Sequence, residues 1–167
     1  SCGYSSAACG TDILFLETMA ERGGETHVFL PFAKDEFIET SVRRAGGNWV
    51  ARFEKVLDQA TAIHYVTREG YNGEDSLFSF CNDIMLGFTA MRGRGLDENP
   101  NLLVFWDGQK GTTGGTGELV ERWKANFNEP VVIDAKEVLS TVSDTEQLPP
   151  ISGEAKSTSA ATEGNSA

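Results

Sequence analysis

The sequence predicts an α/β fold in which a mostly parallel β-sheet is covered by helices on both faces. Short apolar segments alternate with longer amphipathic segments along the chain, which is the order expected of βαβ units. The short segments are continuously apolar, as is typical of strands that are buried on both sides. Two glycine-rich turns open helices, at positions where parallel α/β folds bind ligands. The 167 residues are enough for one domain with a core of its own.

The first part of the chain predicts a loop, a helix and a strand. Residues 1–6 are small and polar, so we read them as a loop. Apolar residues at helical spacing predict a helix over 7–22, and Gly23 ends it. The apolar run over 26–30 predicts a buried strand that stops at Pro31.

The rest of the chain continues the same alternation. Helices are expected over 35–42, 49–60, 76–92 and 116–127, and strands over 62–66, 102–106 and 131–133. These elements place a domain at residues 1–140. Residues 141–167 are rich in Ser, Thr, Glu, Gly and Ala and have few apolar anchors, which predicts a disordered tail or linker.

The turn over Gly3–Asp12 opens a helix without a strand before it. Such a turn usually sits at the end of a parallel strand. We therefore expect the domain to lack its first strand, which would lie ahead of Ser1, and the chain to be a segment of a longer protein.

Composition excludes several classes of function. A formal net charge of -11 argues against a nucleic-acid partner, because phosphate contacts need clustered Lys and Arg. The three cysteines form no C-x-x-C pair, so neither a zinc site nor a redox dithiol is indicated. We expect no metal and no cofactor. No apolar run is long enough to span a membrane, and the sparse cysteines suit a reduced compartment, so a cytoplasmic location without a membrane partner is expected.

The two glycine-rich turns are the candidate ligand site. Small residues let the backbone approach a ligand, and the free N–H groups of a helix N-terminus favour an anion. The first turn is Gly3–Asp12 and the second is Gly111–Glu118, and we expect both to face one cleft. Their alternative reading is as plain tight turns or a flexible surface loop. The candidate ligand-binding residues are Gly3, Ser5, Ser6, Gly10, Asp12, Asp107, Gly114, Gly115 and Thr116.

Other polar residues carry weaker signals. His27 and His64 lie on strands and have no partner at metal-ligand spacing, so a structural role is expected. Glu118 and Glu121 follow the second turn and are the only catalytic candidates, although a solvated helix face is the default for both. No base is evident for Ser5 or for Ser6 as a nucleophile.

The pattern of residues resembles a known family. Gly3–Phe15, Val28–Phe32, Trp106–Gly108 and Gly114–Thr116 are similar to a Rossmann-like module found beside nucleotide cyclase, tetratricopeptide-repeat and TRAF-binding kinase-type regions of signalling proteins. This group is related to the lysine-decarboxylase-like (LOG) and DprA proteins, together called SLOG. The resemblance covers about residues 3–133 and implies a Rossmann-like three-layer sandwich that binds nucleotides or their derivatives.

The resemblance leaves three functions open. The first is a ligand-sensing, nucleotide-binding module of a larger signalling protein. Its expected partners are a nucleotide or another phosphate-bearing small molecule, an effector domain in the same polypeptide and a second copy of the chain in a homodimer. The second is a phosphoribohydrolase-like enzyme that cleaves the N-glycosidic bond of a nucleoside monophosphate. Relatives of that kind carry P-G-G-x-G-T-x-x-E with an arginine nearby, whereas Thr113–Glu121 lacks the proline and departs from this order. The third is a protein-interaction scaffold.

Overall fold

The strands form two parallel sheets. The computed structural model describes residues 1–111 and 113–145 of the chain. The first sheet has the order β1-β2-β3, with β1 at Cys2–Ser5, β2 at Glu25–Leu30 and β3 at Ala62–Tyr65. The second sheet pairs β4 (Leu103–Trp106) with β5 (Val131–Asp134), also in parallel. The predicted α/β class with parallel strands is confirmed, although the sequence suggested one sheet rather than two.

Helices lie between the strands as predicted, with shifted boundaries. The helix expected over 7–22 begins only at Thr11, and the one expected over 76–92 runs on to Leu96. The weak segment expected over 35–42 is a short helix followed by a π-helical turn at Ile38–Val42 and a 3-10 turn. The helices are α1 (Thr11–Glu21), α2 (Lys34–Phe37), α3 (Trp49–Gln59), α4 (Ser76–Leu96), α5 (Thr116–Asn126) and α6 (Ala135–Thr145).

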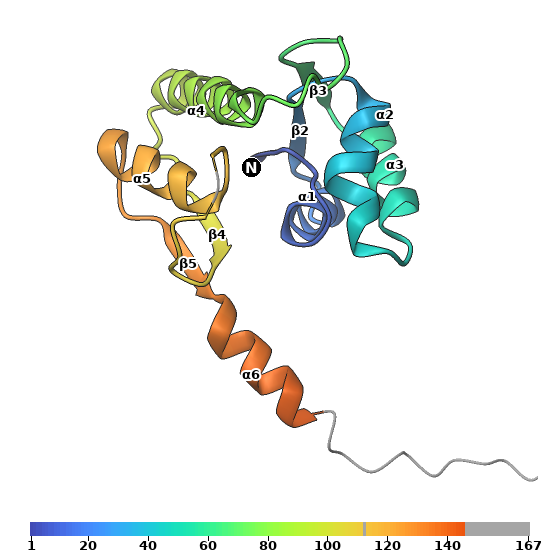
Figure 1. Cartoon of the computed structure of the whole chain (residues 1–167). Coiled ribbons are helices and arrows are strands. Elements are labelled where there is room, and N and C mark those ends of the chain that lie inside the picture. The colour runs from blue at the N-terminus through green and yellow to red at the C-terminus, as the bar shows by residue number, and fades with distance from the viewer. Residues whose placement is uncertain (112, 146–167) are drawn as a thin grey trace, which may run out of the picture. The chain divides into compact units, whose positions relative to one another are not determined.

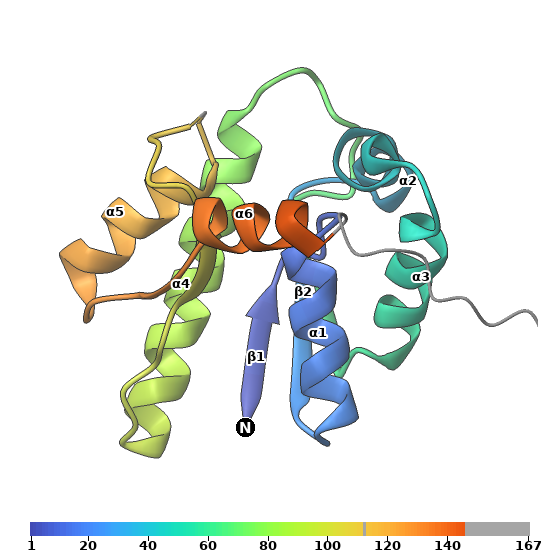
Figure 2. The same cartoon turned by 90° about the horizontal axis from the view of Figure 1, so that it is seen from below.

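Residues 1–6 are not the loop that the sequence suggested. Cys2–Ser5 form a strand that pairs along its length with β2 (Figure 2). The segment lacks a β-branched run, so its sequence gives little local signal for a strand. Its small residues instead suit close packing, since a Cβ at Gly3 would lie 2.8 Å from Cζ of Phe15 in α1. The turn at Ser6–Gly10 therefore does follow a parallel strand.

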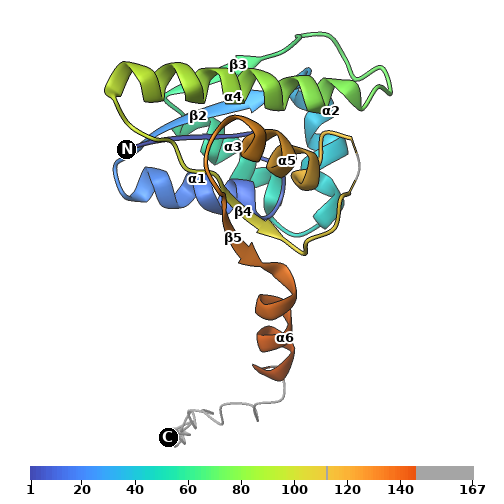
Figure 3. The same cartoon turned by 90° about the vertical axis from the view of Figure 1, so that its left-hand side faces the viewer.

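Helices cover both faces of the first sheet. Figures 1 and 3 show α4 on one side of β1 and β2 and α1 on the other. Helix α3 packs against α1, and its apolar face joins the same core. The largest fully buried side chains of this core include Ile13, Leu16, Phe29, Phe32, Phe37 and Phe53. Strand β5 of the second sheet is less buried than this core: its apolar residues are 42–54% exposed, namely Val131, Val132 and Ile133.

The described residues divide after Ala135 into two units. Helix α6 contains residues 141–145, so the predicted tail begins too early at 141. Good helix formers at Ala135–Leu139 start this helix and carry it into the Ser- and Thr-rich segment. The rest of the predicted tail, 146–167, lies outside the described residues. None of the described helices is long and apolar enough to cross a membrane.

Candidate functional site

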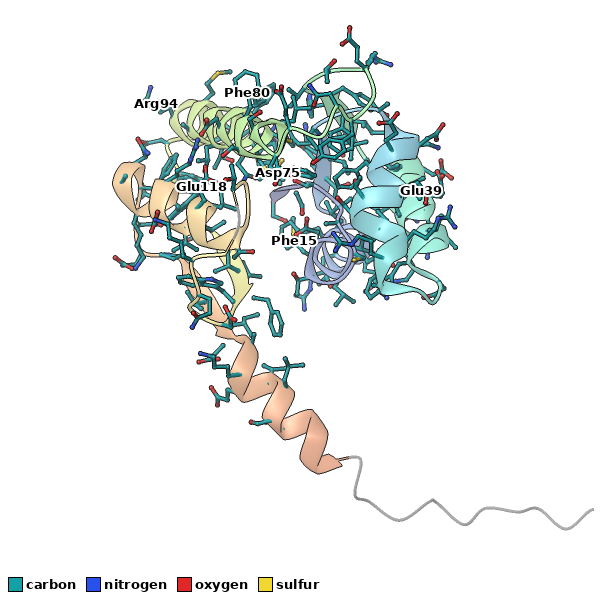
Figure 4. The ribbon with its side chains drawn as sticks, in the orientation of Figure 1. Phe15, Glu39, Asp75, Phe80, Arg94 and Glu118 are labelled. Carbon is teal, nitrogen blue, oxygen red and sulfur yellow. The ribbon has the colours of Figure 1, made fainter. Side chains whose placement is uncertain are left out.

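A cleft of about 1110 Å³ separates the edges of the two sheets. Cys2–Ser5 of β1 line one side and Leu103–Phe105 of β4 line the other. Side chains of α1, α4 and α5 complete the walls, and Figure 4 shows Phe15 of α1 on this side of the helix. The turns that follow β1 and β4 both contribute lining residues, so the predicted common cleft is present.

The first turn is held by hydrogen bonds from two neighbouring amides, those of Ala8 and Cys9. The Cys9 N–H donates to the Ser41 carbonyl oxygen over 3.0 Å, and the Ala8 N–H donates to Oδ2 of Asp12 over 3.2 Å. Buried Ala7 has a left-handed φ of 61°, a conformation that costs a non-glycine residue about 1–2 kcal/mol. Burial raises the pKa of Asp12, and the Ala8 N–H opposes that rise. The cleft thus has a carboxyl group beside a fixed turn.

Helix α4 fixes the second turn through Gly114. Nδ2 of buried Asn82 donates to the Gly114 carbonyl oxygen over 3.0 Å, while the Gly114 N–H donates to Oε2 of Glu118 over 2.7 Å. Gly114 has a φ of 74°, and a Cβ there would lie 2.8 Å from the Ser79 nitrogen. Only glycine fits this position. Gly115 and Thr116 follow at the start of α5 and line the cleft.

Glu118 is a structural residue of this turn and does not lie on a solvated helix face. Glu118 is labelled in Figure 4. Besides the Gly114 N–H, its carboxylate accepts hydrogen bonds from the Ser79 hydroxyl and from Arg122. The Ser79 hydroxyl, the Gly114 N–H and Arg122 together lower the pKa of Glu118. Arg122 also pairs with Asp83 of α4. Arg122 lies beyond the glycine-rich segment, and the i,i+4 spacing of Glu118 and Arg122 is the sequence signal that links it to the second turn.

A smaller recess of about 450 Å³ adjoins the second turn. It shares Ser41, Phe78, Gly114 and Gly115 with the cleft. Exposed Arg44 adds a cation to its lining. Neither Arg44 nor Ser41 belongs to a glycine-rich turn, so sequence spacing could not place them at the site.

The structure brings most of the candidate ligand-binding residues together. Those that line the cleft are Gly3, Ser5, Ser6, Asp12, Gly114, Gly115 and Thr116. Gly10 lies outside the lining and precedes α1 with a φ of 98°. Asp107 also lies outside it, because its Oδ1 accepts the Gln109 N–H in a local turn. Exposed Glu121 faces Lys110 at 3.8 Å.

Cys81 is the buried thiol of the cleft. It lies on α4 and is 1% exposed. Burial raises its pKa to about 12, so the thiol stays protonated at neutral pH. It is therefore not a thiolate nucleophile.

The two histidines have partners that sequence spacing did not show. Nδ1 of His27 lies 3.1 Å from Nε2 of His64, across neighbouring strands. The ligand atoms of Cys2, Glu25 and His27 lie within 4.8 Å of one another. Arg92 donates a hydrogen bond to the Glu25 carboxylate over 2.8 Å. The negative charge of Glu25 therefore already has a cationic partner. Sequence spacing could not show these contacts, because β2 and β3 align residues that are far apart in the chain.

Comparison with known proteins adds no family to these observations. No protein-family model and no curated protein matches the chain. The resemblance to the SLOG group accordingly stays a prediction.

Proposed function

We propose that this chain is a nucleotide-binding sensor module of a larger signalling protein, built as a Rossmann-like three-layer sandwich. The observation that carries the proposal is that the turns after β1 and β4 line one cleft. The strands form two parallel sheets, β1-β2-β3 and β4-β5, and β1 and β4 line opposite sides of the cleft. Doubly wound folds bind ligands at the carboxyl ends of parallel strands, which is where both turns lie.

The chemistry of the cleft suits a phosphate-bearing ligand. Helices α1 and α5 both begin at its lining, at Thr11 and Thr116, and their N-terminal dipoles favour an anion. Ser6 and Thr116 supply hydroxyl donors, and Arg44 supplies a cation in the adjoining recess. Asp12 can accept a hydrogen bond from a ribose hydroxyl.

Binding without turnover is the better-supported outcome. The sequence offered two glutamates as catalytic candidates, and neither faces the cleft. Glu118 holds the second turn, and Glu121 is 63% exposed and lies outside the cleft lining. We therefore assign no catalytic role to either glutamate.

A thermal-shift titration with nucleoside monophosphates and inorganic phosphate tests the proposal. A ligand present at 100 times its dissociation constant stabilises the folded state by about 2.7 kcal/mol. Gly115→Val is expected to abolish that shift, because a branched side chain blocks backbone approach to a phosphate. Gly87→Ala, on the exposed side of α4, is the matched control and is expected to keep the shift.

Three results would contradict the proposal. The absence of any shift across the nucleotide panel would favour the scaffold. A shift that survives in Gly115→Val would place the ligand elsewhere. Steady release of free base from nucleoside monophosphates, lost in Glu118→Gln or Glu121→Gln, would make the protein an enzyme.

A further inference from the structure

One face of the first sheet brings together three side chains that can bind a metal ion. Cys2 of β1 lies beside Glu25 of β2 in the parallel register, and His27 follows Glu25 on the same strand. Register partners, and residues two apart on a strand, direct their side chains to the same face of a sheet. One ligand atom from each of the three residues accordingly lies within 4.8 Å of the others. Sequence spacing did not indicate this cluster, because Cys2 is far from the other two residues in the chain.

Neighbouring side chains hold two members of the cluster in place. The His27 ring lies 5.1 Å from the Tyr4 ring and 5.4 Å from the His64 ring, measured between ring centroids. Arg92 of α4 donates to Oε2 of Glu25 over 2.8 Å. A carboxylate has two oxygens and about four lone-pair sites, so Glu25 can keep this hydrogen bond while it binds a cation. Outer contacts of this kind orient the ligands of metal sites.

Nε2 of His27 is a buried nitrogen without a hydrogen-bond partner among the described residues. The His27 side chain is 15% exposed, and Oε2 of Glu25 lies 4.0 Å from this nitrogen, beyond hydrogen-bond distance. The other ring nitrogen, Nδ1, lies 3.1 Å from Nε2 of His64, which can accept a hydrogen bond from it. In that tautomer Nε2 of His27 carries a lone pair, which is the form that binds a metal. Buried polar atoms normally have partners, so this nitrogen calls for one.

The cluster is accessible from the cleft and lies apart from the glycine-rich turns. Cys2 and Glu25 both line the cleft. Cys2 begins β1, whereas the first turn follows Ser5 at the other end of the strand. Three residues of a strand span about 10 Å. The cluster is therefore separate from the proposed phosphate site, and an ion can reach it through the cleft.

We propose that Cys2, Glu25 and His27 form a binding site for one Zn²⁺ ion, held by the thiolate sulfur, a carboxylate oxygen and Nε2. Sulfur and nitrogen donors favour Zn²⁺, whereas Mg²⁺ and Ca²⁺ take oxygen ligands. Binding releases the thiol proton of Cys2 to solvent, and the thiolate and carboxylate charges then balance the charge of the ion. Three protein ligands leave the fourth tetrahedral position to a water molecule from the cleft.

The ligand atoms need only a small adjustment to reach coordination distances. With Zn–S bonds of about 2.3 Å and Zn–N or Zn–O bonds of about 2.1 Å, tetrahedral ligand atoms lie roughly 3.4–3.6 Å apart. Nε2 of His27 and Oε2 of Glu25 are 4.0 Å apart, and all the ligand atoms lie within 4.8 Å of one another. Because the Glu25 side chain is 50% exposed, it can turn toward the His27 nitrogen without disturbing the core.

Absorption spectroscopy with Co²⁺, which adopts the tetrahedral geometry of zinc sites, tests the proposal in the 167-residue chain. A bond from Co²⁺ to a thiolate gives a charge-transfer band in the near ultraviolet that oxygen and nitrogen ligands do not give. One equivalent of Co²⁺ is expected to produce this band, and excess Zn²⁺ is expected to remove it. Cys2→Ser is expected to abolish the band. Cys9→Ser is the matched control, because Cys9 is also partly exposed but lies outside the cluster, and it is expected to keep the band.

Competition with a chromophoric zinc chelator measures the contribution of the histidines. His64→Phe keeps the ring contacts with Phe29 and Phe88 but cannot accept the hydrogen bond from His27. Loss of such an outer partner is expected to weaken zinc binding by about 10–100-fold. His27→Gln removes a ligand and is expected to weaken binding more than His64→Phe does. Thermal melts without metal establish that the variants are folded.

Three results would overturn the proposal. The first is the absence of the sulfur band at one equivalent of Co²⁺ in the unaltered chain. The second is a band that persists in Cys2→Ser or disappears in Cys9→Ser. The third is binding of several Co²⁺ ions without a sulfur band, which would show only weak association with acidic side chains. Cys2→Ser exchanges a single sulfur for oxygen, so it decides the question even if His27→Gln fails to fold.

Discussion

Replacing Glu118 by alanine tests whether this carboxylate holds the second turn. Glu118 is 23% exposed and accepts hydrogen bonds from the Gly114 N–H, the Ser79 hydroxyl and Arg122. Hydrogen bonds to charged groups contribute about 1.5–3 kcal/mol each, and a partly buried donor left without its partner costs about 1–3 kcal/mol. These contributions are not additive, since Arg122 keeps its contact with Asp83. We expect Glu118→Ala to lower the free energy of unfolding by about 2–3 kcal/mol.

Glu121→Ala is the matched control on the same helix. Glu121 is 63% exposed and lies 3.8 Å from Lys110, itself 81% exposed. An exposed pair of this kind contributes little, so the expected change is within about 0.5 kcal/mol. Urea denaturation of the two variants measures both values. Equal losses in both variants would refute the role assigned to Glu118.

The pH dependence gives a second readout for Glu118. Its folded-state pKa lies below the ordinary value of 4.5, so the unfolded state binds its proton first as the pH falls. The stability that Glu118 contributes is complete above the unfolded-state pKa and is lost as the pH falls through the folded-state pKa. The difference between the wild-type protein and Glu118→Ala is therefore expected to be largest at neutral pH and to shrink in acid. A difference that grows in acid would contradict this assignment.

Three further pairs of measurements test the packing around the cleft. Gly117→Ala is expected to destabilise the protein by about 1–3 kcal/mol, because its Cβ would lie 2.8 Å from the Lys110 carbonyl carbon. Gly87→Ala meets open space in α4 and is expected to stabilise the protein by about 0.5–1 kcal/mol. Thermal melts that rank the two variants the other way would contradict this. Urea denaturation is expected to show a larger loss of stability in Arg52→Ala than in Arg43→Ala. Arg52 pairs with half-buried Glu17 and stacks 4.3 Å from the Trp49 ring, whereas the Arg43–Glu39 pair is exposed. Equal losses in the two variants would contradict the ranking. Cys81 in the native protein is expected to resist a thiol reagent at pH 8 and to react fully in denaturant, since its thiol is buried with a pKa of about 12. Fast labelling of Cys81 in the native protein would contradict this burial.

The sequence predicted the elements that have a local signal. The apolar run Val28–Leu30 and the helical spacing of Phe53, Val56 and Leu57 lie where the pattern placed them. Strand β1 was missed because its Gly3 and Ser5 are buried only through packing against α1, which is a tertiary effect. The extra turn of α4 beyond Arg92 was missed because Gly93 and Gly95 favour an earlier end.

The candidate site was predicted in part for the same reason. Ser6, Asp12 and Gly115 belong to turns that the sequence marks by small residues, and all three line the cleft. Asn82 and Arg44 come from α4 and from the turn after Val42, and only the fold brings them to Gly114 and its recess. Gly10 and Asp107 were included because they adjoin the turns, yet their local geometry directs them away from the cleft lining.

The most direct test of the central claim is a ¹H–¹⁵N NMR titration of the 167-residue chain with a nucleoside monophosphate. If the two turns form one site, the amides of Ser6–Asp12 and of Gly114–Thr116 shift together and fit a single dissociation constant. The amide of Gly87, on the exposed side of α4, stays unchanged in that case. Shifts confined to one turn, or centred on residues outside the cleft, would contradict a shared nucleotide site.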